Sequence, residues 1–319
     1  MMLSEIGERR IIEELKKFLD IGDDAAYIRF GYKYLILTTD MIYQETHILK
    51  QMTWEQIGML IVTVNLSDIA AMGAKPVAFL LGYGSPDISF DNFKTLIKAV
   101  KKQCERFDTK FVGGDTNQTE KLTLSGTLIG ISEKPVLRSN ARVGDIVAIT
   151  GDLGSASLGT RILMKDGVNK KKLKNPVFKK ALEPEPRVKE GLILSKYVNS
   201  MTDISDGLSI SIRDIAESSN VGIEIELDKI PIDDRTFNLA IENGEDIMKH
   251  ALYGEGDYEL LFTINKKNFE IIRNILSVYK IGRVTKNKEI AGVDSKGVRF
   301  RIERGGYEHF KSKHQKEKA

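Results

Sequence analysis

The first half of the chain alternates between segments whose apolar residues recur at helical and at strand-like spacing. Between residues 8 and 19 the apolar positions Ile11, Ile12 and Leu15 share one helical face, which predicts an amphipathic helix. The same reasoning predicts two longer helices, at residues 54–72 and 90–107. Strands are predicted at residues 34–38, 77–82, 109–112 and 122–131. This half is therefore expected to form a domain of mixed α and β structure.

Regular patterning stops at Glu133-Lys134-Pro135, where charge and proline replace it. We place the domain boundary there, so the predicted domains are residues 1–134 and 135–319. In the second half, strands are predicted at residues 146–150, 222–227 and 259–264, and helices at residues 155–164, 187–197, 208–218 and 268–276. The order of elements resembles that of the first half. The expected fold class is thus α/β (α+β), with two mixed α/β domains.

Composition narrows the range of partners. Of the 319 residues, 41% are hydrophobic and 29% are charged, as is ordinary for a globular protein, and the net charge is only +3. We interpret the basic runs at residues 170–174 and 311–318 as a solvated loop and tail, not a nucleic-acid interface. No signal peptide is visible, and the most apolar stretch, residues 59–74, is too short to span a bilayer. The single cysteine, Cys104, indicates a reducing compartment and argues against a zinc site. We expect a cytoplasmic protein that binds neither nucleic acid nor membrane.

Acidic residues recur where strands end or turns begin. Two short phrases, Gly22-Asp23-Asp24 and Asp203-Ile204-Ser205-Asp206-Gly207, show the pattern, as do Asp40 after Thr38-Thr39 and Asp115 after Gly113-Gly114. Any one of these acids is more often a turn former or a helix cap than a ligand. Gathered at one sheet edge, they would repel each other unless divalent cations were bound. Carboxylate oxygens suit Mg²⁺, which is often completed by substrate phosphates, so a phosphorylated substrate is expected.

Asp68 lies inside the most apolar predicted helix, where an unpaired buried carboxylate is unfavourable. Two interpretations stay open: an ion pair with a lysine or arginine, or a bound metal ion. Asn65 and Ser67 lie close by in the sequence and add further oxygen donors.

Candidate phosphate contacts are less specific. Residues 150–159 place glycines ahead of a predicted helix, whose free N–H groups can bind an anion, although a helix entry without any ligand is equally compatible. Thr160-Arg161 stands where a Walker A loop requires Lys-Ser/Thr. Arg138 could pair with phosphate oxygens or lie on the surface. No Ser/His/Asp set is visible, so we assign no general base and expect metal-assisted transfer to an acceptor that is already anionic.

In combination, these phrases resemble those of the thiamine-monophosphate kinases over nearly the whole chain. The shared phrases, in order, are Gly22-Asp23-Asp24-Ala25-Ala26, Thr38-Thr39-Asp40-Met41, Val64-Asn65-Leu66-Ser67-Asp68-Ile69, Gly113-Gly114-Asp115-Thr116, Leu137-Arg138-Ser139, Asp203-Ile204-Ser205-Asp206-Gly207-Leu208 and Asp257-Tyr258-Glu259-Leu260. The family belongs to the aminoimidazole ribonucleotide synthetase-like superfamily. The resemblance implies a homodimer formed through the N-terminal sheets, with ATP as co-substrate and Mg²⁺ bound between the two domains.

The resemblance also implies roles for individual residues. Magnesium ligands would be Asp24, Thr38, Thr39, Asp40, Asp68, Asp115, Asp203 and Asp206. ATP would be bound by Gly114, Asp115, Arg138 and Ser205, and the acceptor by His47, Asp257, Tyr307 and Phe310. One departure from the family pattern is Gly256, which stands where the family has a substrate-binding glutamate. Either Glu255 or Asp257 could take over that role.

The expected reaction is phosphorylation of thiamine monophosphate by ATP, giving thiamine diphosphate and ADP. A sibling ATP-dependent activity of the superfamily is one alternative, and a non-catalytic nucleotide-binding regulator is another. Selenophosphate synthetases usually carry an N-terminal cysteine or selenocysteine, and the hydrogenase maturation proteins carry a C-terminal cysteine. Cys104 instead lies inside a predicted helix, which argues against both activities. Retention of every acidic phrase argues against the regulator.

Overall fold

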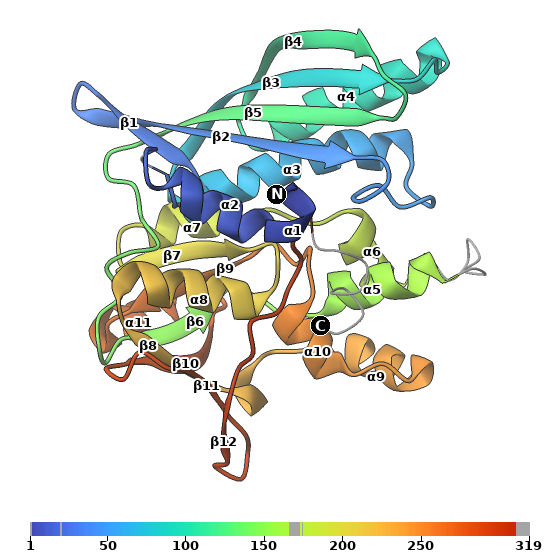
Figure 1. The fold of residues 1–319 in the computed structure, drawn as a ribbon. Helices are drawn as coiled ribbons and strands as arrows, with labels where there is room; N and C mark the ends of the chain where they lie inside the picture. Colours follow the sequence, from blue (N-terminus) through green and yellow to red (C-terminus); the bar gives the residue numbers. More distant parts are fainter. Residues whose placement is uncertain (1, 20, 166–172, 174, 311–319) are drawn as a thin grey trace.

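The computed structural model describes residues 2–19, 21–165, 173 and 175–310, and it consists of two α/β domains stacked on each other (Figure 1). Apart from Leu173, the two basic runs of the sequence lie outside the described residues. The strands of the N-terminal sheet are β1 (Ala26–Phe30), β2 (Lys33–Tyr43), β3 (Lys75–Ser85), β4 (Lys110–Gln118) and β5 (Thr123–Ser132), in the order β1-β2-β5-β3-β4. Only the β3 and β4 pair is parallel among these neighbours. Helices α3 (Trp54–Ala71) and α4 (Phe90–Arg106) cover one face of this sheet.

The C-terminal domain contains a seven-stranded sheet in the order β12-β11-β8-β10-β6-β9-β7. These strands are β6 (Ile146–Ile149), β7 (Ser200–Ile204), β8 (Gly222–Glu226), β9 (Glu259–Ile264), β10 (Tyr279–Thr285), β11 (Ile290–Val293) and β12 (Arg299–Arg301). The helices of this domain are α5 (Ser155–Met164), α6 (Pro176–Leu182), α7 (Val188–Leu194), α8 (Leu208–Ser219), α9 (Asp234–Asn243), α10 (Ile247–Tyr253) and α11 (Lys266–Ile272). No helix in the described ranges is long and apolar enough to cross a membrane.

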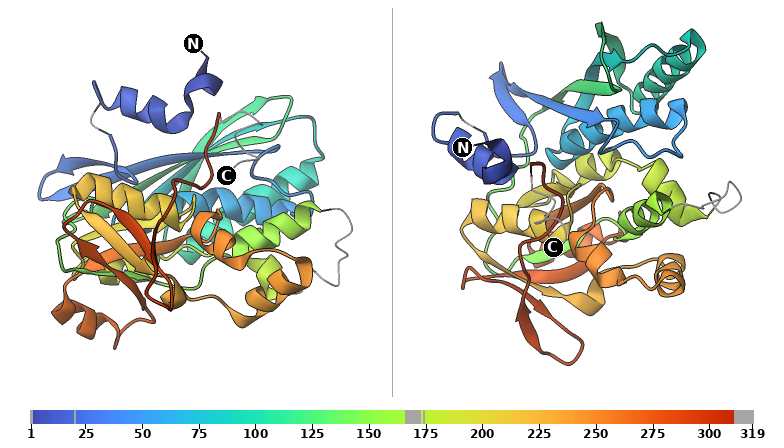
Figure 2. Two further views of the ribbon diagram at one scale, coloured as in Figure 1. Left: turned by 60° about the horizontal axis from the view of Figure 1, so that its bottom comes forward. Right: turned by 45° about the vertical axis from the view of Figure 1, so that its right-hand side comes forward.

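The N-terminal helices α1 (Leu3–Ile6) and α2 (Glu8–Leu15) lie beside the end of the described chain (Figures 1 and 2). The backbone N–H of Glu8 donates to the carbonyl of His309 at 3.4 Å, and the His309 N–H donates to the Glu8 carboxylate at 3.0 Å. The two ends of the described part of the chain therefore meet above the C-terminal domain.

The predicted fold class and the predicted helices are confirmed, whereas several short elements were missed. Strand β7 is buried along its whole length and so lacks the alternation that marks a half-exposed strand, while β12 is exposed along its whole length. Strands β1, β10 and β11 and helices α6, α9 and α10 were also not predicted. The predicted helix at residues 8–19 ends earlier, at Leu15.

Helix α3 is the element that joins the two domains. It is apolar on all sides, because it packs against β2 and β5 of its own domain and against α7 and β7 of the other. A single core accordingly contains Ile36 of the N-terminal sheet, Leu66 of α3 and Phe262 of the C-terminal sheet. Thr53 and Gln56 form a capping box at the start of the helix. The position of α3 is thus fixed by both domains at once.

Helix α7 approaches α3 so closely that one position must be glycine. A Cβ atom added at Gly191 would lie 2.2 Å from the carbonyl oxygen of Ala70, which is a backbone atom that cannot rotate away. The close contact between the domains therefore depends on the absence of a side chain at Gly191.

We predict that Gly191→Ala lowers the free energy of unfolding by about 1–3 kcal/mol, the usual effect of overpacking. The added methyl group would force α7 away from α3. Thermal unfolding measures the change, and Gly82→Ala is the matched control, because its Cβ would meet Ser125 at an ordinary 3.5 Å. Equal melting temperatures for the two variants would contradict the prediction.

Candidate active site

Three carboxylates from distant parts of the chain meet where the domains join. Asp24 precedes β1, Asp68 lies near the end of α3, and Asp203 lies in β7. Each offers an oxygen atom, and these atoms all lie within 4.8 Å of one another. Asp40 of β2 and Asp206 after β7 interact with the same group: burial and then Asp40 raise the pKa of Asp68, and burial and then Asp203 raise the pKa of Asp206. We call Asp24, Asp40, Asp68, Asp203 and Asp206 the acidic cluster.

The alternation of β2 directs Thr38 and Asp40 toward α3. The Thr38 hydroxyl donates to Asp68 Oδ2 at 2.5 Å, and the backbone N–H of Asp40 donates to Asn65 Oδ1 at 3.2 Å. Asn65 is fully buried, and it fits because Gly126, opposite Asp40, has no side chain: a Cβ there would lie 2.4 Å from Asn65 Nδ2. Asn65 and Asp68 of α3 thus hold β2, the strand that carries Asp40.

Hydroxyl groups join the two domains across the cluster. Ser67 of α3 donates to Asp203 Oδ2 at 2.6 Å, and Ser205 donates to Asp203 Oδ1 at 3.2 Å. Thr202 donates to Asp24 Oδ1 at 2.7 Å. Each of these bonds favours the ionised carboxylate, and together they hold the cluster in place before any ligand is considered.

Burial makes the cluster electrostatically unfavourable by itself. Burial, together with the neighbouring Asp40, Asp203 and Asp24, holds the pKa of Asp68 well above its ordinary value. Burial and the charge of Asp24 raise the pKa of Asp203 to about 7, and burial raises the pKa of Asp40 to about 6. At neutral pH the cluster therefore attracts either protons or a cation.

The chemistry of these donors fits Mg²⁺. Within the described part of the chain, no lysine or arginine forms an ion pair with Asp68, so the ion-pair interpretation of this residue is not supported. Asp24 Oδ2 is buried and accepts no hydrogen bond. Oxygen atoms from carboxylates and hydroxyls are the ligands that this hard cation prefers. Asp24, Asp40, Asp68 and Asp203 are the residues that would hold it.

Arg138 lies at the edge of the acidic cluster. Its Nη2 contacts Asp24 Oδ1 at 2.8 Å, and its Nη1 contacts Asp214 Oδ2 at 3.3 Å. Its backbone N–H donates to Asp23 Oδ1 at 2.6 Å. Because a guanidinium group has five N–H donors, these contacts still leave donors for a phosphate.

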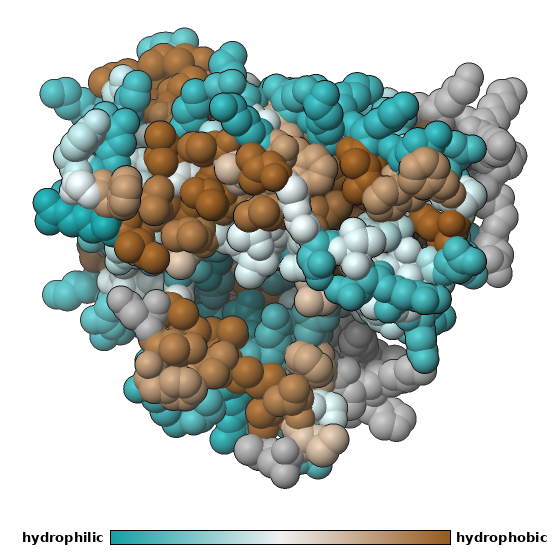
Figure 3. All heavy atoms as spheres, turned by 90° about the horizontal axis from the view of Figure 1, so that it is seen from above, coloured by the Kyte–Doolittle hydropathy of each residue, from teal (hydrophilic) through white to brown (hydrophobic). Residues whose placement is uncertain are grey.

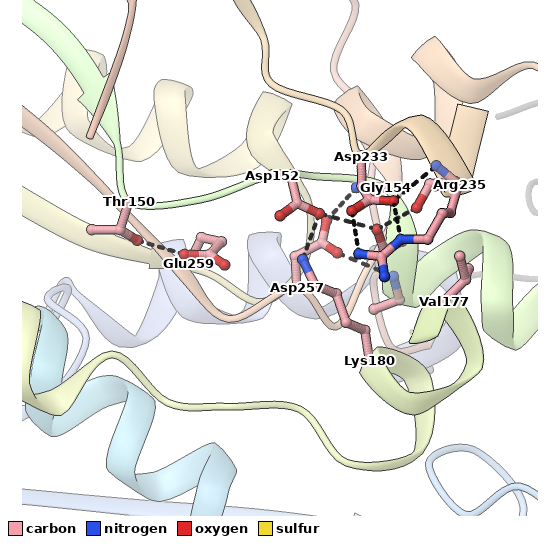
Figure 4. Close-up of polar contacts among 12 residues, drawn as sticks. Thr150, Asp152, Gly154, Val177, Lys180, Asp233, Arg235, Asp257 and Glu259 are labelled. Carbon is pink, nitrogen blue, oxygen red and sulfur yellow. Dashed lines mark hydrogen bonds and ion pairs between the residues drawn. The ribbon is translucent and has the colours of Figure 1, made fainter. Parts of the chain in front are cut away.

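Of the two interpretations left open for the glycine-bearing entry to α5, the structure supports a helix entry without an external anion. The backbone N–H groups of Gly154 and Ala156 donate to the carboxylate of Asp257 at 2.7 and 3.2 Å (Figure 4). An internal carboxylate thus accepts from the N–H groups that a bound anion would need. Asp257, predicted to bind the acceptor, uses both oxygens here, and burial raises its pKa to about 7 despite these donors.

A second polar group nearby supports the same loop. Glu259 accepts from the Thr150 hydroxyl at 2.6 Å and from Arg187 Nε at 2.7 Å, and Figure 4 shows it away from Asp257. Lys180 pairs with Asp152 at 2.5 Å. These contacts are structural, since they tie α6 and the segment before α7 to the C-terminal sheet.

Aromatic residues gather beside the cluster. The rings of His47 and Tyr307 are 6.2 Å apart, those of Tyr307 and His309 are 4.8 Å apart, and Phe310 follows at 6.4 Å from His309. Burial and His309 lower the pKa of His47 to about 4, and its Nδ1 accepts the N–H of Tyr43 at 3.1 Å. Burial, Glu255 and Asp206 raise the pKa of Tyr307 to about 12. The predicted acceptor residues His47, Tyr307 and Phe310 are therefore brought together.

Other predicted residues lie apart from the cluster within one chain. Thr39 points to the opposite face of β2 from Thr38, where its hydroxyl donates to the Gly126 carbonyl at 2.9 Å. Gly114 and Asp115 are on β4, which β5 and β3 separate from β2. Asp115 is exposed and accepts from Asn117 at 2.7 Å.

Sequence reasoning did not identify Asp214, Thr202 or Arg9, which all belong to the network around the cluster. Thr202 directly precedes the recognised Asp203 phrase and could have been found there. Nothing in the sequence indicated a role for Asp214. This residue lies in the middle of α8, and only the folded structure shows which face of that helix is turned toward Arg138.

Comparison with known proteins agrees with this geometry. Residues 22–132 match the N-terminal domain of the AIR synthase related proteins, and residues 142–295 match their C-terminal domain. The thiamine-monophosphate kinase of Pyrococcus horikoshii is 36% identical over 95% of this chain and 94% of its own length. That of Aquifex aeolicus is 32% identical over 97% of this chain and 100% of its own length.

Solved structures give the same result. AaThiL complexed with AMPPCP and TMP superposes with a TM-score of 0.89 at 32% identity, covering 97% of this chain and 99% of that one. Hydrogenase maturation protein HypE in complex with ATP, at 18% identity and a TM-score of 0.71, shares the fold alone. The fold and the acidic cluster thus define an AIR synthase related protein. More narrowly, the chain belongs to the thiamine-monophosphate kinase family.

We predict that, without divalent cations, the free energy of unfolding falls as the pH rises from about 5 to about 8. A carboxyl group whose folded-state pKa is raised takes up a proton on folding, so its favourable contribution is present below the unfolded pKa. That contribution is lost as the pH rises through the folded values, about 6 for Asp40 and about 7 for Asp203. Excess Mg²⁺ should remove the decrease.

Urea unfolding over this pH range, in EDTA and in Mg²⁺, measures the effect. A loss of at least about 1 kcal/mol is expected in EDTA, since one pKa unit corresponds to ~1.4 kcal/mol. If the free energy of unfolding changes with pH in the same way in EDTA and in Mg²⁺, the result would contradict a cation site at the acidic cluster.

Proposed function

We propose that this chain is an ATP-dependent kinase that transfers the γ-phosphoryl group of ATP to the phosphate of thiamine monophosphate, giving thiamine diphosphate and ADP. The observation that carries the proposal is the meeting of the acidic cluster with the aromatic residues, where the backbone N–H of Tyr307 donates to the Asp206 carbonyl at 3.2 Å. Residues 1–134 would supply part of the cluster, and residues 135–319 would complete the site. The names of the curated relatives and the ligands of AaThiL support this reaction.

On the nucleotide side, we assign phosphate contacts to Arg138 and Ser205, and further contacts to Gly114 and Asp115. Mg²⁺, when bound, neutralises charge on the transferring group. Arg138 is held by two carboxylates, so its remaining donors have a defined direction.

On the acceptor side, the aromatic group would contact the thiamine rings. Glu255, rather than Asp257, is the candidate for the glutamate missing at Gly256. Asp257 is bound to the start of α5, whereas Glu255 is close enough to Asp206 and Tyr307 to raise the pKa of each. A carboxylate here would complement the positive charge of the thiazolium ring.

We expect thiamine monophosphate to be phosphorylated in one step and free thiamine to be left unchanged. A phosphate oxygen needs no deprotonation, whereas a hydroxyl does, and the pKa of His47, about 4, makes it a poor base. Mass spectrometry of the products tests this. The pH profile should follow the second ionisation of the acceptor phosphate, which has a pKa of about 6.

Equal rates with thiamine and its monophosphate would contradict the absence of a base. Consumption of ATP with a different acceptor, and with neither of these, would favour a sibling activity of the superfamily.

We also propose a homodimer formed through the N-terminal sheet. The face of this sheet opposite α3 and α4 is open, and apolar side chains form a band across it in Figure 3. Its exposed apolar residues include Ile28, Phe30, Met41, Val77, Leu80 and Val112. An exposed apolar surface of this extent is typical of an interface, and a two-fold pairing would cover it on both subunits.

This dimer would account for the position of Asp115. Within one chain β4 lies three strand spacings from β2, about 14 Å. In a two-fold pair of sheets, the edge strand β4 of one subunit can lie next to the β2 side of the other. Asp115 and Gly114 would then complete the site of the partner subunit.

Co-expression of two inactive variants tests this arrangement. Asp68→Asn and Asp115→Asn should each abolish turnover in homodimers, while a purified heterodimer of the two should recover activity, because one of its two sites would be intact. An inactive heterodimer would place Asp115 in the site of its own chain. Light scattering of Leu80→Asp should show a monomer.

A further inference from the structure

Asp214 of α8 is shared by two arginines that come from distant segments. Its Oδ2 contacts Arg138 Nη1 at 3.3 Å, and its Oδ1 contacts Arg9 Nη1 of α2 at 3.5 Å. Arg138 in turn contacts Asp24 of the acidic cluster. The four side chains therefore form a chain of alternating charge, Arg9, Asp214, Arg138, Asp24, that runs from the N-terminal helix to the candidate metal site.

This chain of charges is largely removed from water. The Asp24 side chain is 0% exposed, and those of Arg138, Asp214 and Arg9 are 22%, 21% and 21% exposed. Burial lowers the pKa of Arg138, but Asp24 and Asp214 outweigh this and hold it above its ordinary value. Arg138 therefore stays positively charged, and at this depth its contacts are screened less than surface pairs are.

The backbone of Arg138 is fixed independently of its side chain. Its N–H donates to Asp23 at 2.6 Å, and its carbonyl accepts from the Ser219 hydroxyl, at the end of α8, at 3.2 Å. The loop would thus keep its place without Asp214. What Asp214 determines is the direction of the guanidinium group, on a side chain with several rotatable bonds.

Asp24 cannot fix that direction alone. Its Oδ1 is shared between Arg138 and Thr202, and its Oδ2 belongs to the acidic cluster that we assign to the cation. A guanidinium group held by Asp24 only would be free to rotate toward Oδ2. It would then compete with Mg²⁺ for the same carboxylate.

We propose that Asp214 is a positioning residue: it holds Arg138 away from the cation ligands and toward the nucleotide, and through Arg9 it couples helix α2 to the site. The proposal rests on the proposed nucleotide contact of Arg138. It adds a residue outside the family motifs and gives the N-terminal helix a role in nucleotide binding.

Asp214→Asn preserves the shape of the side chain and removes its charge. We expect the KM for ATP and the Mg²⁺ concentration for half-maximal activity to rise about 10-fold, equivalent to ~1.4 kcal/mol, with kcat changed less than about two-fold. Asp214→Glu, which keeps the charge, should recover most of the affinity. Arg9→Gln should have a smaller effect in the same direction. Glu217→Gln, at an exposed position one turn further along α8, is the matched control and should change nothing.

Calorimetry with AMP-PCP and Mg²⁺ provides a readout besides activity. Asp214→Asn should weaken binding about 10-fold in the wild-type background but have no further effect in an Arg138→Met background, because the two residues act through one contact. Hydrogen exchange provides another readout: AMP-PCP should protect residues 8–15 in the wild-type protein and not in Asp214→Asn.

The outcomes separate the inference from the function on which it rests. If Arg138→Met weakens AMP-PCP binding and Asp214→Asn does not, the role of Asp214 is overturned while the nucleotide contact stands. If Arg138→Met has no effect, both are overturned. Equal protection of residues 8–15 in the wild-type protein and in Asp214→Asn would overturn the coupling to α2. Thermal unfolding identifies any variant that fails to fold. If Asp214→Asn fails to fold, the affinities of Asp214→Glu and Arg9→Gln for AMP-PCP decide whether Asp214 positions Arg138.

Discussion

The arrangement of this molecule depends on keeping several like charges close together at a buried junction. Asp68 cannot move away from Asp24 and Asp203, because α3 is packed on both sides by one continuous core. Desolvation and repulsion together raise the pKa values of Asp68 and Asp203, so the junction is unfavourable without a positive partner. The hydrophobic core of two domains thus supplies the free energy that holds a site which is itself destabilising.

The protein satisfies one side of this cluster and leaves the other side for ligands. Thr38, Ser67 and Thr202 each donate a hydroxyl to a carboxylate, and Arg138 supplies a positive charge at the edge. These partners come from both domains, so a change in the relative position of the domains would alter the cluster. The same contacts that stabilise the domain junction therefore also define the geometry available to a metal ion and a nucleotide.

The acids of the cluster were predictable from the sequence for a physical reason. Asp40 and Asp203 lie in strands, and Asp24 and Asp206 lie in adjoining turns. The topology of the sheets brings such positions to one edge. Asp68 was recognisable for another reason, as a charged residue within an apolar helix. Contacts between distant side chains were not predictable. The pairing of Arg9 with Asp214 and the capping of α5 by Asp257 join residues about 100 or 200 positions apart, and neither has a local pattern. For that reason the sequence left open whether the start of α5 binds an anion, and it gave no sign that Asp257 caps this helix.

At Gly256, where the resemblance implied a glutamate, the backbone is held by the neighbouring segment. Gly256 has φ +90°, a conformation that favours glycine, and its N–H donates to the Ser205 carbonyl at 2.7 Å. The loop is thereby tied to the segment that carries Asp203 and Asp206, whichever residue stands at this position. Under the proposed function, the neighbouring Glu255 would supply this carboxylate, because after burial it is among the groups that raise the pKa values of Asp206 and Tyr307. What has to be preserved is the position of the loop relative to the cluster, and its backbone hydrogen bonds preserve it.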